Sequence, residues 1–299
     1  MRPLPRRPLL LATLAGALAG CSLDPLEDHD GADAPREGLA APIAPRGVAW
    51  VFSSGGPRGF VHVGVLKALE ELRLTPDLLV GASIGSVVAV LYAAGLGAAR
   101  IETLALELQP WRMARLSPGG SEERLSGAAI ADALRDWLRE AGRGARLEQL
   151  PIPTLCAALR LDGRGVVAFG QGDAGLAAQA SCAIEGRLAP VRIRGQGYAD
   201  PDLAAPLPVR LARAAGARRV LAIDASAHEE QAPAGAERFR AGDVRKRALT
   251  EPDARAADLL LHPSFGYWVS LSREFRERAI RAGYEATLAQ AQRLRELHR

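Results

Sequence analysis

Lysine is nearly missing from this sequence, as are several features that mark common classes of protein. Only Lys67 and Lys246 are lysines, so the other 36 of the 38 Lys and Arg residues are arginines. Aromatic residues make up 5% of the chain and its mean hydropathy is 0.00, which together exclude a polytopic membrane protein. No His, Cys, Asp or Glu group has metal-site spacing, and no G-x-G-x-x-G or G-K-[ST] motif indicates a nucleotide site. We therefore expect neither a metal nor an organic cofactor.

The net charge of +4 invites a nucleic-acid interpretation that the charge distribution does not support. Three of the positive charges belong to the first twenty residues, and removing that segment leaves +1. Zinc-finger spacing and interleaved basic and aromatic residues are both missing. Nucleic acid is therefore not an expected partner, and 299 residues that are 48% hydrophobic suffice for one large globular domain or two small ones.

The first twenty residues have the pattern of a bacterial signal peptide. Three arginines precede an apolar stretch of about a dozen residues, too short for a spanning helix. The stretch ends in Leu-Ala-Gly-Cys21, which resembles the lipobox of bacterial lipoproteins; an ordinary signal peptide followed by a cysteine is the alternative. The resemblance implies removal of residues 1–20 and a lipid anchor on Cys21. Ser22 favours the outer membrane in that family of signals, so we expect a lipid-anchored outer-membrane protein, facing the periplasm.

Residues 21–46 are expected to form a flexible, acidic, Pro-rich tether. From residue 22 to 46 the net charge is −4, and no apolar periodicity is sustained. The two other cysteines, Cys156 and Cys182, lie among apolar or small residues. A periplasmic disulfide and two buried thiols are therefore both open.

The folded domain is expected to cover residues 47–299. Residues 47–53 are almost all apolar, as in a strand buried on both faces, and residues 60–72 have apolar side chains at helical spacing. Residues 77–80 then repeat the strand pattern, and residues 87–94 the helical one. A glycine-rich turn follows each strand. This order predicts a βαβα unit, with a parallel sheet between layers of helices.

The second glycine-rich turn has the form of a nucleophile elbow. Gly81-x-Ser83-x-Gly85 lies between a predicted strand and a predicted helix. Small flanking residues allow the tight turn, and the serine hydroxyl then projects at the start of the helix, where the helix dipole favours developing negative charge. The pattern indicates that Ser83 is the nucleophile of a hydrolase.

The first glycine-rich turn, Ser-Gly55-Gly56-Pro-Arg58-Gly, offers backbone N–H groups for an oxyanion hole. Pro57 has no N–H, so Gly55 and Gly56 are the expected donors, and Arg58 adds positive charge. Together the two turns resemble the G-G-x-R-G and G-x-S-x-G motifs of the patatin-like phospholipase family. The resemblance runs from residue 47 to about 225 and implies a three-layer helix–sheet–helix domain with a mostly parallel central sheet.

Asp200 falls on the position of that family's catalytic aspartate, in a Ser–Asp dyad without histidine. The family has Gly followed by Gly or Ala after this aspartate, whereas this chain has Pro201 and Asp202. Pro201 restricts Asp200 to extended conformations, and a second carboxylate can raise the pKa of the first. Both departures leave open whether the base is well placed.

Histidine chemistry offers an alternative, because His62, His228 or His262 could complete a triad with Ser83. His228, which follows a predicted strand at residues 220–224, is the best candidate, whereas His62 is expected to be structural. Residues 228–256 are polar and predict a surface loop or lid. Residues 258–263 predict a final strand, and helical sequence follows from about residue 265.

The resemblance implies a phospholipase- or lysophospholipase-type serine carboxylic-ester hydrolase acting on membrane phospholipid or another lipid ester. The catalytic residues would be Ser83 and Asp200, with Gly55, Gly56 and Arg58 at the oxyanion. The alternative is a catalytically impaired lipoprotein that keeps the fold as a lipid-binding or interaction module. Transfer of the acyl group to an alcohol instead of water is a second enzymatic alternative.

Overall fold

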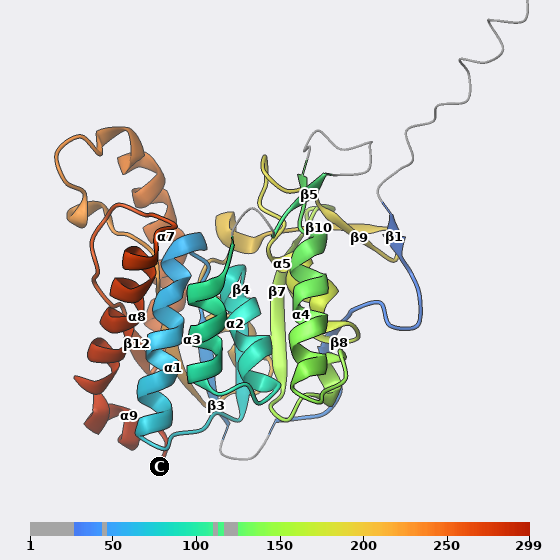
Figure 1. Cartoon of the computed structure of the whole chain (residues 1–299), viewed down its shortest axis with the longest axis horizontal. Coiled ribbons are helices and arrows are strands. Elements are labelled where there is room, and N and C mark those ends of the chain that lie inside the picture. The colour runs from blue at the N-terminus through green and yellow to red at the C-terminus, as the bar shows by residue number, and fades with distance from the viewer. Residues whose placement is uncertain (1–26, 44–46, 110–112, 117–124) are drawn as a thin grey trace, which may run out of the picture.

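The structure is a computed structural model that describes residues 27–43, 47–109, 113–116 and 125–299 (Figure 1). The predicted signal peptide and Cys21 lie outside the described residues. Within them, no helix is both long enough and apolar enough to span a bilayer.

Five parallel strands form the middle of the sheet, in the order β7-β4-β3-β11-β12. They are β7 (Thr154–Arg160), β4 (Leu78–Ala82), β3 (Val48–Phe52), β11 (Arg219–Ile223) and β12 (Leu259–Leu261). Every residue of β3 and β4 is buried, as expected for strands covered on both faces. Along β3, Val48, Trp50 and Phe52 enter one apolar core, whereas Ala49 and Val51 enter a second core on the opposite face.

Beyond β7 the pairing becomes mainly antiparallel. β8 (Gly165–Gln171) and β10 (Gln196–Ala199) both pair with β7, and β9 (Val191–Ile193) pairs with β10. Two further short strands come from the segment for which the sequence predicts a flexible tether: β1 (Asp28–His29) pairs with β9, and β2 (Arg36–Leu39) pairs with β8.

That tether prediction is therefore wrong for the residues that form β1 and β2. The cause is long-range pairing that local composition cannot reveal, since both strands are polar and mostly exposed. Between them Ala34 is buried, and the Asp33 carbonyl accepts a hydrogen bond from the Asp173 N–H.

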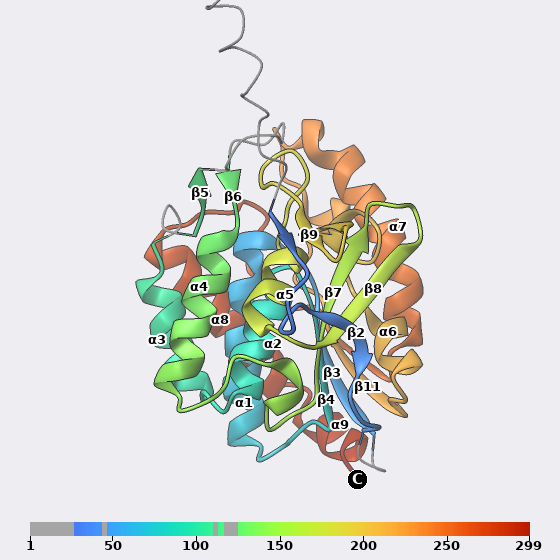
Figure 2. The ribbon, with the colours of Figure 1, turned by 90° about the vertical axis from the view of Figure 1, so that its right-hand side faces the viewer.

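Helices cover both faces of the sheet, which confirms the predicted three layers (Figure 2). Two helices, α6 (Val209–Ala214) and α7 (Arg240–Ala256), lie on one face, and the larger group lies on the other. That group comprises α1 (Val61–Glu71), α2 (Ile84–Ala93), α3 (Ala98–Glu107), α4 (Ala128–Glu140), α5 (Ala174–Ser181) and α8 (Arg273–Leu288). The remaining elements are the α9 helix (Ala291–Leu297), the β5–β6 pair (Arg115–Leu116 and Leu125–Ser126) and the short helices η1 (Gly56–Phe60), η3 (Leu147–Gln149), η4 (Pro201–Leu203), η5 (Glu229–Gln231) and η6 (Glu237–Phe239).

The face with α6 (Val209–Ala214) and α7 (Arg240–Ala256) contains a second departure from the sequence prediction. Residues 228–256, expected as a loop or lid, include the 17-residue helix α7. Only Thr250 and Asp253 are buried in it, so the sequence has no apolar stripe from which this helix could be predicted. An ion pair between Asp253 and Arg210 holds it against α6 instead.

Candidate active site

The structure places Ser83 in the turn between β4 and α2, as the elbow motif predicts. Its backbone angles are φ 53° and ψ −127°, a left-handed conformation that is strained for a residue with a side chain. The Ser83 N–H donates to the Ser181 hydroxyl at 2.8 Å, and the Ser83 carbonyl accepts from the Ser86 hydroxyl at 2.6 Å. These bonds fix the peptide groups on both sides of the hydroxyl.

Glycine is required at Gly81 and Gly85 because other backbone passes directly against them. A Cβ on Gly85 would lie 2.4 Å from the Phe52 carbonyl oxygen of β3, and one on Gly81 would lie 2.3 Å from the Gly85 carbonyl oxygen. The backbone of the elbow thus packs directly against the end of β3. The serine hydroxyl is consequently directed away from the sheet.

Asp200 meets this hydroxyl from the other side of the site. Ser83 Oγ donates to Asp200 Oδ2 at 2.6 Å, and both side chains are buried. Asp200 follows β10, and its N–H donates to the Ala183 carbonyl at 2.9 Å. Burial raises the pKa of Asp200 to about 7, against the lowering effect of the Ser83 hydrogen bond. A carboxylate with such a pKa can take up a proton near neutral pH.

The glycine turn after β3 lies beside this pair. Gly55 and Gly56 line the same pocket as Ser83 and Asp200, and Gly56 has a φ of 51°, which favours glycine. The Arg58 N–H donates to the Gly55 carbonyl at 3.0 Å, which closes the turn. No acceptor among the described residues takes the N–H of Gly55 or Gly56, so both donors are available to a ligand.

Arg58 also lines the pocket, but most of its guanidinium is engaged elsewhere. Nε donates to the Ala225 carbonyl at 2.7 Å, and Nη1 donates to the carbonyls of Gly266 and Tyr267 at 2.8 and 3.2 Å. The group lies 4.3 Å from the centre of the Phe265 ring. Arg58 therefore fastens the loops after β11 and β12 to the glycine turn, a role the sequence did not suggest. Nη2 is buried without a partner among the described residues.

The histidines do not contact Ser83. His62 is fully buried, with Nε2 3.0 Å from the Ser53 carbonyl oxygen, and burial lowers its pKa to about 4, in line with a structural role. His228 lies 3.5 Å from Asp224 at the end of β11, and a hydrogen bond to that carboxylate raises the pKa of His228. His228 has its own carboxylate, so the hydrogen bonds form a Ser83–Asp200 pair and a separate His228–Asp224 pair.

Asp224, His228 and His262 gather ligand-type atoms within 4.8 Å of one another, a cluster that the sequence spacing did not reveal. The two imidazole rings stack at 3.9 Å between centroids with only 20° between their planes. Lone pairs lie in the ring planes, and nearly parallel planes do not converge on one point. The two rings cannot both bind a single metal ion as they stand.

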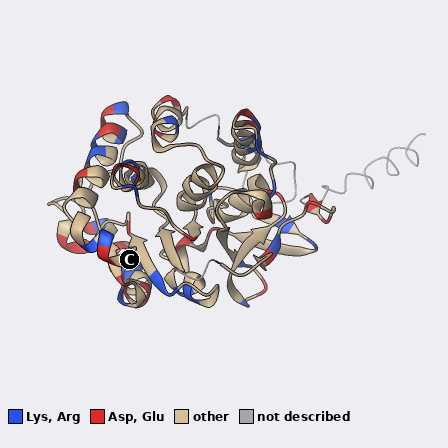
Figure 3. Cartoon of the chain, turned by 90° about the horizontal axis from the view of Figure 1, so that it is seen from below, with Lys and Arg blue, Asp and Glu red and all other residues tan. Residues whose placement is uncertain are grey.

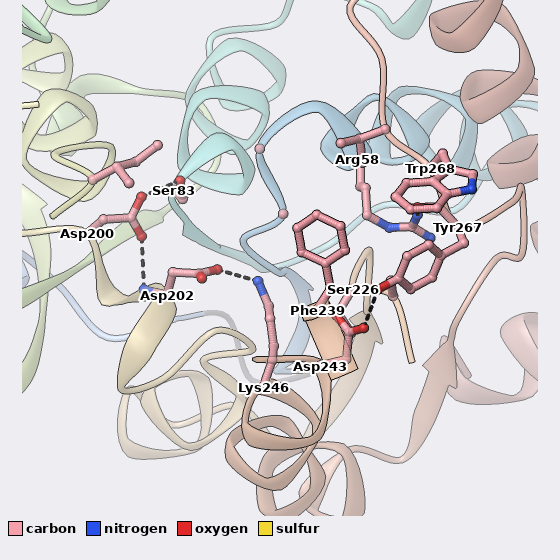
Figure 4. A pocket seen from close by; sticks show the side chains of 15 residues that line it. Arg58, Ser83, Asp200, Asp202, Ser226, Phe239, Asp243, Lys246, Tyr267 and Trp268 are labelled. Carbon is pink, nitrogen blue, oxygen red and sulfur yellow. Dashed lines mark hydrogen bonds and ion pairs between the residues drawn. The ribbon is translucent and has the colours of Figure 1, made fainter. Parts of the chain in front are cut away.

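A pocket of about 340 Å³ opens above Ser83 (Figure 4). One wall holds Ser83, Asp200 and the glycine turn. The opposite wall comes from the chain beyond residue 225, where sequence patterns predict little. It comprises Ser226, Ala227, Phe239, Asp243, Lys246, Tyr267, Trp268 and Val269. We call this the Ser83 pocket.

Comparison with known proteins identifies the family. A family model described as patatin-like phospholipase matches residues 50–213. The chain belongs to this family. The matched residues include the glycine turn, the Ser83 elbow and Asp200, whereas β11, α7, β12 and α8 follow the matched segment in the chain.

Relatives of this patatin-like chain include longer proteins. An uncharacterized NTE family protein of Mycobacterium bovis is 34% identical over 190 residues, which cover 62% of this chain and 50% of that protein. Patatin-like phospholipase domain-containing protein 6 of Homo sapiens is 29% identical over 195 residues, covering 64% and 14%. The chain thus spans half or less of the length of these relatives. The crystal structure of VipD from Legionella pneumophila has the same fold, with a TM-score of 0.56, 16% identity and coverage of 93% and 73%.

The patatin-like pattern is altered directly after Asp200, and the structure accommodates both changes. Asp200 has φ −60° and ψ 130°, the extended conformation that a following proline favours, and Pro201 begins η4. The Asp202 N–H donates to Asp200 Oδ1 at 2.9 Å. The Asp202 side chain bonds instead to the Ser54 hydroxyl and to Lys246 of α7.

Lys246 was not singled out by the sequence, although it is one of only two lysines. Its charge offsets that of Asp202 beside the buried Asp200: Asp202 raises the pKa of Asp200, and Lys246 lowers it. The second carboxylate therefore comes with its own counter-ion, supplied by a helix 44 residues further along the chain.

Proposed function

We propose that this protein hydrolyses lipid esters, as a phospholipase- or lysophospholipase-type enzyme, with Ser83 as nucleophile and Asp200 as base. The observation that carries the proposal is the 2.6 Å hydrogen bond from Ser83 Oγ to a buried carboxylate whose pKa is raised to about 7. The bond lies at the floor of an open pocket. Membership of the patatin-like phospholipase family supports the same reaction class.

The reaction would proceed through an acyl-enzyme. Ser83 Oγ attacks the ester carbonyl carbon while Asp200 accepts the hydroxyl proton, and the N–H groups of Gly55 and Gly56 donate to the oxyanion. The tetrahedral intermediate collapses, the alcohol leaves with the proton from Asp200, and the acyl group remains on Ser83. Asp200 then takes a proton from water, whose oxygen attacks the acyl carbonyl. As this second tetrahedral intermediate collapses, Asp200 returns the proton to Ser83 Oγ, and the fatty acid is released. Arg58, held by backbone carbonyls through Nε and Nη1, would contribute positive charge to the pocket that it lines.

An apolar cavity next to the elbow supports an acyl substrate. It has a volume of about 160 Å³ and lies among α1, α2, α3 and α4. Ile84, which follows Ser83, and Cys182, which follows Ser181, both line it. The remaining lining is apolar and includes Phe60, Val88, Leu104 and Trp137. Such a lining suits a hydrocarbon chain, because burial of each methylene contributes about 0.8 kcal/mol.

Labelling with a fluorophosphonate probe tests the nucleophile directly, because the probe reacts with activated serines. The wild-type chain should be labelled and should release p-nitrophenol from short-chain p-nitrophenyl esters, whereas the S83A variant should do neither. Absence of labelling in a folded wild-type chain would instead favour the non-catalytic lipid-binding alternative.

We also propose that Cys21 carries a lipid that anchors the protein in the outer membrane, with the domain in the periplasm. The signal-like residues 1–20 and the Leu-Ala-Gly-Cys21 sequence support this. The C21A variant should leave the membrane fraction or keep its signal segment. Unchanged fractionation with the outer membrane would contradict the anchor.

A further inference from the structure

Four large apolar residues that line the Ser83 pocket are exposed to solvent at its mouth. Their exposed fractions are 36% for Ile184, 41% for Phe239, 49% for Trp268 and 54% for Val269. We call these four residues the rim. Ile184 comes from the side of the pocket that carries Asp200, and the other three come from the opposite wall, so the rim flanks the opening on both sides. Exposed apolar side chains around an opening indicate contact with an apolar surface.

Contacts between the rim's segments hold part of it in place before any partner arrives. The Phe239 and Trp268 rings meet edge to face at 5.9 Å, and Trp268 meets Tyr267 in the same way at 5.3 Å. The Tyr267 hydroxyl in turn donates to Asp243 of α7 (Figure 4). Trp and Phe held in this way suit the boundary between lipid headgroups and acyl chains.

Basic residues accompany the rim. Residues 237–247 contain five Arg or Lys and two acidic residues, a net charge of +3. Arg238, Arg240 and Arg245 are exposed, and none has a carboxylate partner among the described residues. The Arg238 guanidinium lies 4.6 Å from the centre of the Phe239 ring, so a positive charge adjoins the rim itself. Arginine matches the geometry of phosphate groups, and its long stem lets the charge reach headgroups above inserted apolar residues.

From these observations we infer that the rim, with Arg238, Arg240 and Arg245, docks onto a bilayer containing anionic phospholipid, so that the mouth of the Ser83 pocket faces the lipid. This inference rests on the proposed function for the nature of the substrate. It adds that the pocket would take lipid directly from a negatively charged membrane surface. Phe239 and the three arginines lie on one segment, and the Phe239 ring contacts Trp268, so apolar area and positive charge adjoin each other as in other interfacial binding elements.

Quenching of Trp268 fluorescence by brominated phospholipid tests the docking in the full chain. All variants carry S83A, so the result does not depend on turnover, and failure of docking is distinguishable from failure of the hydrolase proposal. The Trp268 signal is the difference between each protein and its W268F counterpart. We expect quenching in vesicles of phosphatidylcholine with phosphatidylglycerol, and much less in phosphatidylcholine alone.

Replacing the three arginines by glutamine (R238Q, R240Q and R245Q) should lower the affinity of the protein for the anionic vesicles, measured by Trp268 quenching, about 100-fold. Each cation near such a surface strengthens binding several-fold. Replacement by lysine should preserve most of it. The matched control is R73Q, R100Q and R139Q, which removes the same number of positive charges far from the rim. Basic and acidic residues share several helices of the chain (Figure 3).

The control positions are remote from the rim because they lie near the starts of β3 and β4, whereas the Ser83 pocket lies at the ends of these strands. Arg73 lies in the loop from α1 to β4, which runs beside the start of β3, since the Asp77 N–H donates to the Val48 carbonyl. The start of α3 lies near the end of α1, since the Ala98 N–H donates to Glu70 at 2.9 Å. Arg100 in turn pairs with Glu140, the neighbour of Arg139. The control should bind as the parent does. Unquenched Trp268 in anionic vesicles, or equal losses in the two triple variants, would overturn the inference.

Discussion

At the Ser83 elbow, backbone lies against backbone, whereas in the wall opposite, side chains make the contacts. Gly85 has the Phe52 carbonyl within 2.4 Å of where a Cβ would stand. Lys246 joins the opposite wall to Asp202 by an ion pair. The two segments of that wall are joined to each other by the Tyr267–Asp243 hydrogen bond and the Phe239–Trp268 ring contact. We call residues 237–247 and 265–269 the cover. The difference indicates that the elbow fixes the reacting atoms, while the cover adjusts their charge and access.

The largest effect should come from the reacting pair itself. Both S83A and D200N should lower ester hydrolysis about 10⁴-fold or more, because the nucleophile is lost in one and the proton acceptor in the other. Steady-state hydrolysis of p-nitrophenyl butyrate measures this, with H228A as the control on the cover side of the pocket. H228A should keep activity within about fivefold, and a severe loss there would point to a triad built on His228.

Adding one methyl group to a glycine should have opposite consequences in the two regions. G85A should lower the free energy of unfolding by about 3 kcal/mol or more, because the new Cβ has no room against β3. G242A in α7 meets nothing within 4 Å and should raise it by up to about 1 kcal/mol through helix propensity. Urea unfolding of both variants gives the comparison, and a G85A protein as stable as the parent would refute the close-packed elbow.

The pH dependence should respond to the cover. Asp200 must be deprotonated to accept the serine proton, so activity should rise as the pH passes through about 7. K246M leaves Asp202 without its counter-ion, which raises the pKa of Asp200 and should move the rising limb up by about one pH unit. D202N should move it down. Profiles of kcat/KM against pH would show this, and shifts in the same direction would contradict the charge assignment.

The smallest effect is expected where the cover is fastened by a single polar contact. Y267F removes the hydroxyl that donates to Asp243 and keeps the ring contact with Trp268. We expect hydrolysis of a soluble ester to change by less than about threefold, since one such hydrogen bond contributes roughly 1 kcal/mol. A loss as large as that of S83A would mean that the cover also places the reacting atoms.

The same contrast explains what could be predicted from the sequence. The elbow and the glycine turn follow from local patterns, in which a buried apolar strand, small residues and an apolar helix adjoin one another, and Ser83 and Asp200 do lie in contact. The family resemblance was needed for Asp200, because no local pattern links it to a serine 117 residues earlier.

The sequence failed where structure depends on polar contacts between distant residues. β1 and β2 are short and exposed, and their partners lie more than 130 residues away. α7 has a proline at residue 252, within the helix, and just two buried side chains, so neither periodicity nor propensity favoured a helix. Lys246 could not be assigned to Asp202 without the fold, because charge pairing has no sequence period.

The pairing of β1 with β9 has a consequence for movement at a membrane. Six residues lie between Cys21 and Asp28, where the strand begins, so the two Cα atoms are seven residue steps apart and at most about 25 Å from each other when the chain is fully extended. If Cys21 carries the proposed lipid, a short segment connects the bilayer to the edge strand β1 of the sheet. The domain then cannot move far from the bilayer surface. It would then reach its substrate by lateral diffusion in the plane of the membrane and by tilting about the anchored Cys21.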